Sequence, residues 1–268
     1  MRAGARSVML TCVANIEILH RDDVEAQDRY AAGHDAVGLL SSRRLAPAGY
    51  SLWVCASEFR GGGEIHWNGE SAEEAVYVVS GALDLDGRAC PADGAVIVES
   101  GVRASARAVG PTQLLHFGPS DLTPPSGGVY GPPGVEGHGV HVVGADGRFT
   151  SGSREGTFAR WYADSTCPRC RLCLIQVERT SARVGPAHQH SEDEIIFVIG
   201  GAIGLGERWL EPGSALFVSA DARYQIRSGE AGYRFLNYRR DLSQQIYDPD
   251  GPPQLESALA RGGVEVGS

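Results

Sequence analysis

The sequence lacks any long hydrophobic run. Its apolar stretches are interrupted within about ten residues, whereas a helix that crosses a membrane needs roughly 20. It also lacks an excess of basic residues: the formal net charge is -9, which disfavours binding to the phosphates of a nucleic acid. Gly-rich phosphate-binding motifs and a GxSxG motif are absent as well. We therefore expect a small-molecule partner, and neither a membrane nor a nucleic acid.

Cysteines are few and scattered along the chain. A chain of 268 residues can bury a core without disulfide bonds, so these cysteines indicate reduced thiols and a cytoplasmic location. The stretch Met1–Ile18 is interrupted by Asn15 and Glu17 and has no clear small-residue cleavage site, so we interpret it as the start of the mature protein. The six cysteines are Cys12, Cys55, Cys90, Cys167, Cys170 and Cys173.

Three of these cysteines, Cys167, Cys170 and Cys173, are spaced like half of a zinc site. A structural zinc site needs four ligands, usually two pairs, and the sequence offers no second pair. We interpret the three as packing or loop residues, with metal binding and redox chemistry as the alternatives.

The sequence repeats itself at an interval of about 120 residues. The segment Glu74–Gly101 matches Glu194–Asp221, and further along the chain His116 matches Asn237. A repeat of this length indicates a duplicated domain and not a solenoid unit. We therefore expect a first domain at 1–122, a linker at 123–157 and a second domain at 158–268.

The linker and both domains have distinct patterns. The linker is rich in Gly and Pro, but its run Val140–Val143 favours a strand that packs on a neighbouring domain. In both domains, Gly and Pro turns interrupt short apolar runs every six to ten positions, which predicts an all-β fold. The best helix candidates are Asp22–Ala31 and a short piece at Gln254–Ala260.

The second domain contains a motif that favours metal binding. His188 and His190 are separated by one residue, so both point to the same side of a strand. A short turn then brings Glu194 back on the paired strand. Two imidazoles and one carboxylate with open positions suit Fe(II), which we favour, and also Mn, Zn or Ni. The sequence thus predicts one divalent metal ion at these three residues.

These residues carry a resemblance to a known family. His188-Gln-His190, then Glu194, and Gly201 after six more residues resemble the first motif of the cupins. Pro212-Gly213 and the residues after it resemble the second motif, in which Tyr224 stands at the position of the usual fourth ligand, a His. The resemblance covers most of both halves and implies two cupin barrels in tandem, of the double-stranded β-helix or jelly-roll type, with few short helices.

Tyr224 is the candidate catalytic residue. A phenol with a pKa near 10 resists ionisation, so we favour a hydrogen bond to substrate or proton transfer over metal ligation. Arg160 and Arg171 are the candidate substrate-binding residues, because either guanidinium suits a substrate carboxylate through two parallel hydrogen bonds.

The first domain keeps only part of the motif. His66 and Glu74 remain, but Asn68 stands where the second His is expected. We therefore expect a metal-free scaffold barrel. A site formed by His66, Glu74 and His116 is the alternative, because His116 can enter the barrel from the last strand.

The resemblance favours a metal-dependent enzyme that acts on a small polar or aromatic molecule, with a dioxygenase of the Fe(II) type as the leading interpretation. The two-barrel layout is also similar to ureidoglycine aminohydrolase bicupins, whose ligand set differs, and this favours a hydrolase or isomerase as the alternative. A non-catalytic small-molecule-binding cupin is the third reading. Exposed edge strands are compatible with a homodimer.

Overall fold

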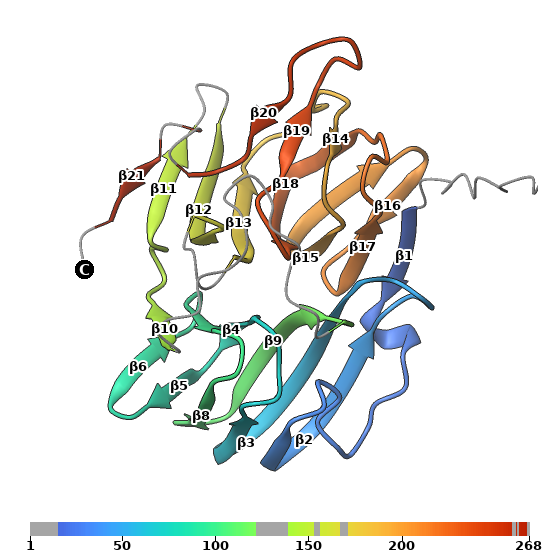
Figure 1. Cartoon of the computed structure of the whole chain (residues 1–268). Helices are drawn as coiled ribbons and strands as arrows, with labels where there is room; N and C mark the ends of the chain where they lie inside the picture. The colour runs from blue at the N-terminus through green and yellow to red at the C-terminus, as the bar shows by residue number, and fades with distance from the viewer. Residues whose placement is uncertain are drawn as a thin grey trace, which may run out of the picture.

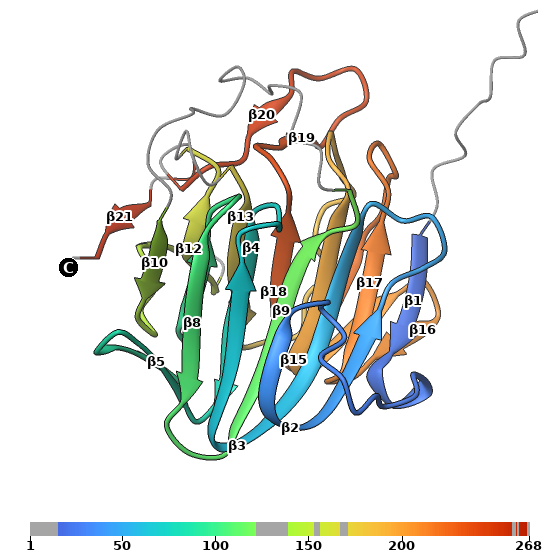
Figure 2. The same cartoon turned by 60° about the horizontal axis from the view of Figure 1, so that its bottom comes forward.

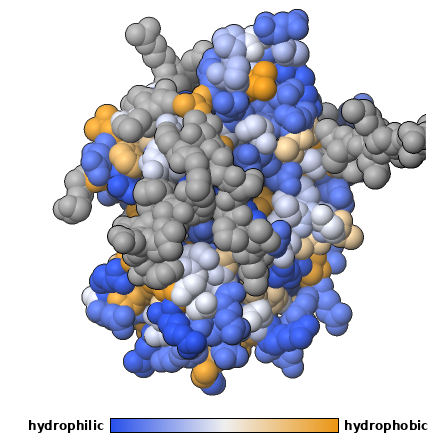
Figure 3. Space-filling model, in the orientation of Figure 1, coloured by the Kyte–Doolittle hydropathy of each residue, from blue (hydrophilic) through white to orange (hydrophobic). Residues whose placement is uncertain are grey.

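The computed structural model describes residues 16–121, 139–152, 156–166, 171–258, 261 and 263–266. These residues form two large antiparallel sheets and a small third one, and each large sheet curls into a barrel (Figures 1 and 2). The all-β fold predicted from the sequence is confirmed. Most of the described surface on the side seen in Figure 3 is hydrophilic, as expected when the apolar residues fill the barrels.

The N-terminal barrel has the strand order β10-β7-β4-β9-β3-β8-β5-β6, and β2 pairs with β3. Its strands are β2 (Asp35–Leu45), β3 (Leu52–Asn68), β4 (Glu74–Ser80), β5 (Ala82–Leu85), β6 (Arg88–Pro91), β7 (Ala95–Val98), β8 (Arg103–Ala108), β9 (Thr112–Pro119) and β10 (Val140–Val143).

The C-terminal barrel has the order β1-β17-β15-β18-β13-β12-β11-β21, and β16 pairs with β15. A small sheet, β14-β19-β20, lies beside it. The strands of these two sheets are β1 (Ile16–His20), β11 (Phe149–Gly152), β12 (Thr157–Asp164), β13 (Cys173–Arg179), β14 (Gln189–His190), β15 (Glu194–Leu205), β16 (Arg208–Leu210), β17 (Ser214–Val218), β18 (Ile226–Arg239), β19 (Gln244–Ile246), β20 (Gln254–Leu255) and β21 (Val264–Glu265).

Side chains of β4 alternate between two cores. Ala75 and Tyr77 pack in a core to which both barrels contribute, whereas Val76 and Val78 fill the interior of the N-terminal barrel. Because successive side chains of a strand point to opposite faces, Glu74 shares the inner face with the two valines. A buried carboxylate is thereby placed inside the barrel.

Strand β15 repeats this arrangement in the C-terminal barrel. Ile195 and Phe197 belong to the shared core, and Ile196 and Val198 belong to the inner one. The same alternation turns Glu194 inward. The duplicated sequence thus places one carboxylate at the same point of each barrel.

Three strands outside the matched segments of the repeat join the two large sheets. Strand β1 precedes the N-terminal barrel in the sequence but pairs with β17 of the C-terminal barrel, with Ile16 opposite Val218. Strand β10, in the predicted linker, pairs with β7 of the N-terminal barrel, with Val140 opposite Val98. Strand β11 also lies in the predicted linker and pairs with β12. The sheets therefore do not follow the predicted domain limits.

The helix predictions were wrong where the structure tests them. Within Asp22–Ala31 only a single 3-10 turn forms, at Arg21–Asp23, and Gln27 makes an isolated β-bridge to Ser42. At the other candidate helix, Gln254–Leu255 is strand β20, and residues 259–260 lie outside the described residues. Pairing with a neighbouring strand overrides a weak helical pattern here. In the described part of the chain, no helix is long and apolar enough to cross a membrane.

Candidate metal centres

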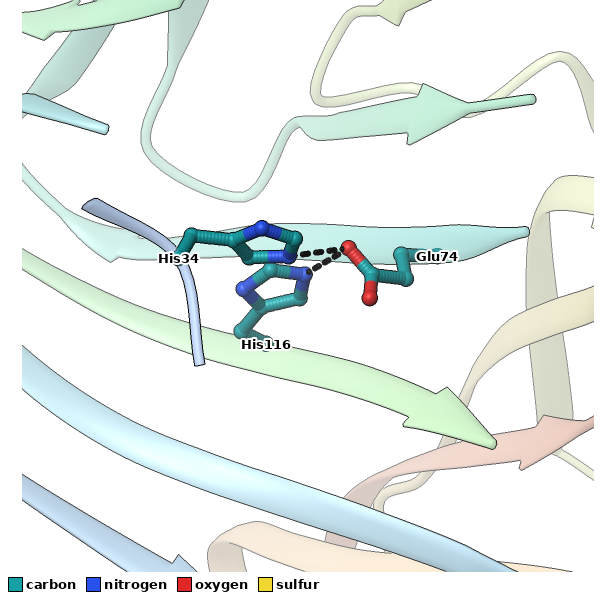
Figure 4. A group of neighbouring side chains, drawn as sticks. All are labelled: His34, Glu74 and His116. Atoms are coloured by element: carbon teal, nitrogen blue, oxygen red, sulfur yellow. Dashed lines mark hydrogen bonds and ion pairs between the residues drawn. The ribbon is translucent and has the colours of Figure 1, made fainter. Parts of the chain in front are cut away.

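Three potential metal ligands meet inside the N-terminal barrel. His34 precedes β2, Glu74 begins β4 and His116 lies on β9 (Figure 4). One ligand atom from each lies within 4.8 Å of the others, and among the described residues this is the only group of three or more His, Cys, Asp or Glu that meets this criterion. Two imidazoles and a carboxylate form a donor set suited to a divalent transition metal.

A single carboxylate oxygen joins the group. Glu74 Oε2 accepts hydrogen bonds from His34 Nε2 at 2.7 Å, from His116 Nε2 at 3.0 Å and from Trp67 Nε1 at 2.9 Å. Burial by itself raises the pKa of Glu74, but the charges and hydrogen bonds of the two imidazoles outweigh it and lower the pKa to about 2. Glu74 is therefore ionised and available as a ligand at neutral pH.

Aromatic side chains fix the two imidazoles. The His34 and His116 rings are stacked, with centroids 5.4 Å apart and planes 14° apart. The Tyr30 hydroxyl lies 2.7 Å from His116 Nδ1. Burial lowers the pKa of His116 more than the carboxylate raises it, so this imidazole is neutral, as a metal ligand must be.

The C-terminal barrel contains a pocket of about 430 Å³. One part of its wall is apolar and includes Trp161, Ile175, Val177, Ile226 and Phe235. The other part is polar and includes His188, His190, Tyr224, Asn237, Arg239, Gln245, Tyr247, Glu256 and Arg261. An apolar pocket with a few converging polar groups is the usual form of a small-molecule site.

Two of the three predicted ligands line this pocket, and the third, Glu194, is buried next to one of them. His188 and His190 line it, with ring centroids 5.0 Å apart, and His190 Nε2 is 3.7 Å from Oε2 of the fully buried Glu194. Their ligand atoms do not all fall within the 4.8 Å that the N-terminal group satisfies.

Hydrogen bonds orient both imidazoles. His188 Nδ1 lies 3.0 Å from the carbonyl oxygen of Pro186, which can only accept, so Nδ1 carries the proton. His190 Nδ1 lies 3.0 Å from Glu256 Oε2, an ion-pair distance, and 3.4 Å from the hydroxyl of Ser243. An imidazole that is neutral and carries its proton on Nδ1 keeps a lone pair on Nε2. A carboxylate that holds the second nitrogen of a histidine is a common support for a metal ligand.

Glu194 keeps one oxygen without a partner. Its Oε2 accepts from Asn237 Nδ2 at 2.7 Å and from Arg239 Nη2 at 3.1 Å, whereas Oε1 has no hydrogen-bond partner and is buried. Burial raises the pKa of Glu194, but the charges of His190 and Arg239 outweigh it and lower the pKa. The ionised carboxylate thus presents one free oxygen, which is where a cation or a hydrogen-bond donor fits.

The Tyr224 hydroxyl lies 3.2 Å from His188 Nε2. Burial, reinforced by the charge of Glu194, raises the pKa of Tyr224 well above its usual value of 10. The phenol therefore stays protonated at neutral pH, and its chemistry is that of a hydrogen-bond donor and not of an anionic ligand.

Comparison with solved structures identifies the fold. A variant of Bacillus subtilis oxalate decarboxylase has a TM-score of 0.63 at 15% identity, over 88% of this chain and 80% of that chain. The glyoxylate-induced protein of Pseudomonas aeruginosa has a TM-score of 0.63 at 16% identity, over 88% and 91%. Both are bicupins. The chain has the bicupin fold. Lactobacillus farciminis oxalate decarboxylase, solved with formate, matches with a TM-score of 0.63 at 15% identity, over 88% and 89%. No family model and no curated protein matches the sequence.

Sequence reasoning misplaced one residue of the N-terminal group and missed another. His66 does not meet His116: its side chain is 40% exposed and pairs with Glu64 at 3.4 Å. Strand β3 turns the next residue, Trp67, into the barrel instead, and a shift of one residue reverses every side chain of a strand. His34 was missed because it belongs to no motif and to neither copy of the repeat.

Arg160 and Arg171 do not line the C-terminal pocket. Strand β12 directs Trp161 toward the pocket, so Arg160 lies on the opposite face, 3.3 Å from Glu178. Arg171 is 1% exposed and pairs with Asp241 at 2.9 Å. These placements indicate structural ion pairs for both arginines.

The cysteine cluster is only partly described. Cys173 lies buried on β13 as a free thiol, and Cys167 and Cys170 lie outside the described residues. Cys55 and Cys90 are also buried and free. Free thiols at these positions are compatible with the predicted reduced state.

Proposed function

We propose that this bicupin is a metal-dependent enzyme that acts on a small polar or aromatic molecule in the C-terminal pocket. The cation would be held there by His188, His190 and Glu194. The observation that carries the proposal is the free, buried Oε1 of Glu194 beside two imidazoles whose Nδ1 atoms are already engaged. Such a set of acceptors is incomplete without a cation or a donor.

The donor set points to the class of metal. Two histidines and one carboxylate with open positions are typical of Fe(II) sites and also suit Mn(II). A solved structure of the Bacillus subtilis oxalate decarboxylase is described by its Mn(II) centres, which makes manganese the second choice. When bound, either metal would supply Lewis-acid polarisation, and iron would add redox chemistry.

The residues of this chain have separate roles in the proposal. Tyr224 holds a proton at its hydroxyl and donates a hydrogen bond to a substrate oxygen. Arg239 fixes Glu194 through Nε and Nη2, at 3.2 and 3.1 Å, and therefore orients the free oxygen. The apolar wall, with Trp161 and Phe235, excludes water from the body of the substrate.

Two reaction classes compete within this proposal. A site of two histidines and one carboxylate favours a dioxygenase on iron, and we place this first. A hydrolase or isomerase on manganese or zinc is the alternative, because a bound cation also activates water and polarises a carbonyl. A binding protein without catalysis is the remaining reading, and a homodimer stays a prediction.

Metal analysis followed by turnover assays tests the proposal. Protein purified without added metal is analysed for iron, manganese and zinc, then stripped and reloaded with Fe(II) or Mn(II). Oxygen uptake and product release are measured with a panel of small carboxylic and phenolic acids. Uptake of oxygen on iron supports the dioxygenase, and product release without oxygen uptake supports the alternative.

Matched variants assign the signal to the C-terminal pocket. Glu194→Gln should abolish turnover, and Glu207→Gln, an exposed glutamate in the same barrel, should keep it. Turnover that survives in Glu194→Gln, or binding of a panel compound that needs neither metal nor Glu194, would contradict the proposal.

A further inference from the structure

The segment between β1 and β2 connects the two barrels. Strand β1 belongs to the C-terminal sheet and β2 to the N-terminal one, so residues 21–34 must pass from one barrel to the other. Apart from the bonds of Tyr30 and His34, the described hydrogen bonds of the segment to the N-terminal barrel are the bridge of Gln27 to Ser42, at 2.8 and 3.1 Å, and two bonds of Ala31, whose N–H donates to Ser42 Oγ and whose carbonyl accepts from Arg44. His34 is its last residue, and Tyr30 lies within it.

Both of these residues enter the barrel. His34 Nε2 is 2.7 Å from Glu74 Oε2, and the hydroxyl of Tyr30 is 2.7 Å from Nδ1 of His116. The connecting segment therefore supplies one of the three clustered ligands (Figure 4). It also supplies Tyr30, which orients His116. The barrel supplies the rest from β4 and β9.

The cluster is closed and supported. The exposed fractions of the His34, Glu74 and His116 side chains are 7%, 5% and 0%. Trp67 Nε1 holds the carboxylate at 2.9 Å, as the second group around a metal ligand commonly does. The three side chains leave one of the four positions of a structural zinc site, which a water molecule would fill inside the closed barrel, whereas a catalytic site keeps that position open to substrate.

The imidazoles of the cluster can take the tautomers that binding of a cation requires. Both imidazoles now donate from Nε2 to Glu74. A ligand nitrogen must present a lone pair, so in the loaded site each imidazole would carry its proton on Nδ1 instead of Nε2. At His116 the Tyr30 oxygen would accept this proton. A tyrosine hydroxyl both donates and accepts, so Tyr30 supports either tautomer.

We propose that His34, Glu74 and His116 hold a second divalent cation whose role is structural. It would hold the connecting segment, residues 21–34, in its place on the N-terminal barrel. Two imidazoles select a transition-metal dication such as Zn(II) over Ca(II) or Mg(II), which prefer oxygen. This inference replaces the expectation of a metal-free first barrel, and it does not depend on the proposed catalysis.

Zn(II) titration of the stripped, full-length Glu194→Gln protein tests the inference, because this background removes the C-terminal site. Three proteins are compared: the background itself, the background with His34→Ala, and the background with His66→Ala. The last is the matched control, since His66 is an exposed histidine of the same barrel. We expect one tightly bound Zn(II) in the first and third proteins and none in the second.

The structural role of the cation is tested by the Tm and by amide hydrogen exchange. Zn(II) should raise the Tm of the background and of the His66→Ala protein by at least about 3 °C, and should leave that of the His34→Ala protein unchanged. Amide exchange in residues 21–34 should slow at least about tenfold on loading. Equal Zn(II) binding with and without His34, or binding that leaves exchange in this segment unchanged, would overturn the inference.

If the His34→Ala protein does not fold, the exchange measurement on the background protein with and without Zn(II) still decides the question. The catalytic proposal fails independently, by turnover that survives Glu194→Gln in protein loaded with Fe(II) or Mn(II).

Discussion

The two barrels share one frame but complete it differently. In both, the first residue of a central strand is an inward glutamate, Glu74 or Glu194. In each barrel the carboxylate accepts a hydrogen bond from the neighbouring strand. In the N-terminal barrel the donor is His116, which pairs with Val76, and in the C-terminal barrel it is Asn237, which pairs with Ile196. Both copies of the repeat therefore have the same strand pairing around the glutamate, whereas the side chains that surround the carboxylate differ.

The difference lies in what else reaches the carboxylate. In the N-terminal barrel it is Trp67 and a histidine from the connecting segment, which close the site. In the C-terminal barrel it is Arg239, next to two histidines that line an open pocket. The same fold thus supports a closed and an open site, because the residues that reach the carboxylate differ: one closing histidine comes from the connecting segment, and Arg239 stands only in the C-terminal barrel.

The largest expected effect concerns Arg239, which has no counterpart in the N-terminal site. It pairs with Glu194 at 3.1 Å and with Glu256 at 2.7 Å, so Arg239→Met leaves two buried carboxylates uncompensated. We expect the free energy of unfolding to fall by about 3–5 kcal/mol, measured by urea denaturation. Arg234→Met, on the same strand and 38% exposed, is the control. A loss below about 1 kcal/mol for Arg239→Met would show that the pairing is not as buried as described.

Tyr224 tests the open site. Tyr224→Phe removes a protonated hydroxyl next to His188 and should lower kcat by about 10²–10³ with a small change in KM, because general acid–base catalysis contributes a factor of this size. Tyr247→Phe changes a second hydroxyl of the same pocket and should have a much smaller effect. Equal losses in the two variants would argue against a specific role for Tyr224.

Exchanging the two matched residues, His116 and Asn237, tests whether their positions are equivalent in the two barrels. His116→Asn makes the N-terminal site resemble the C-terminal one, and Asn237→His does the reverse. We expect His116→Asn to weaken Zn(II) binding in the N-terminal barrel by more than the roughly 10–100-fold that the loss of an outer-shell partner costs, because a nitrogen ligand itself is lost. Asn237→His should strengthen metal binding in the C-terminal pocket. Isothermal titration on each stripped protein measures both. If neither affinity changes, the two positions are not equivalent in metal binding.

The smallest effect concerns pH. Burial, together with the charges of Asp241 and Asp193, raises the pKa of Glu192 to about 7. The folded state therefore binds this proton more tightly than the unfolded state does, so the contribution of Glu192 to stability is fully present below about pH 4.5 and is lost as the pH rises through 7.

Because Glu192 is partly exposed, the change should be only on the order of 1 kcal/mol. Glu192→Gln should flatten this part of the stability–pH curve, measured by urea denaturation between pH 5 and 8. The control Glu207→Gln should leave it unchanged. An unaltered slope in Glu192→Gln would assign the pH dependence to another group.

Much of the frame was predictable because it depends on local patterns. The repeat located both glutamates, and the strict alternation of β4 and β15 turned both inward. The motif placed His188 and His190 at one pocket and Glu194 beside His190, because the three residues are close in sequence. His116 was noted as a residue that can enter the first barrel, and it does.

The failures share a cause as well. His66 was aligned with a ligand position, but a register that no motif encodes turned Trp67 inward in its place. Arg160 and Arg171 were chosen for their chemistry, and ion pairs with Glu178 and Asp241 hold them elsewhere. Which face an isolated residue occupies depends on partners far away in the chain.

The sequence by itself determined the two β barrels, the repeated glutamate and the histidine motif, since each follows from spacing along one or two neighbouring strands. Only the tertiary structure decided that β1 crosses to the other barrel, that His34 joins Glu74 and His116, and that Arg239 pairs with Glu194. These contacts join residues that lie roughly 40 or more positions apart in the sequence. The free energy that selects them comes from burial and charge compensation in the assembled barrels, which no local pattern records.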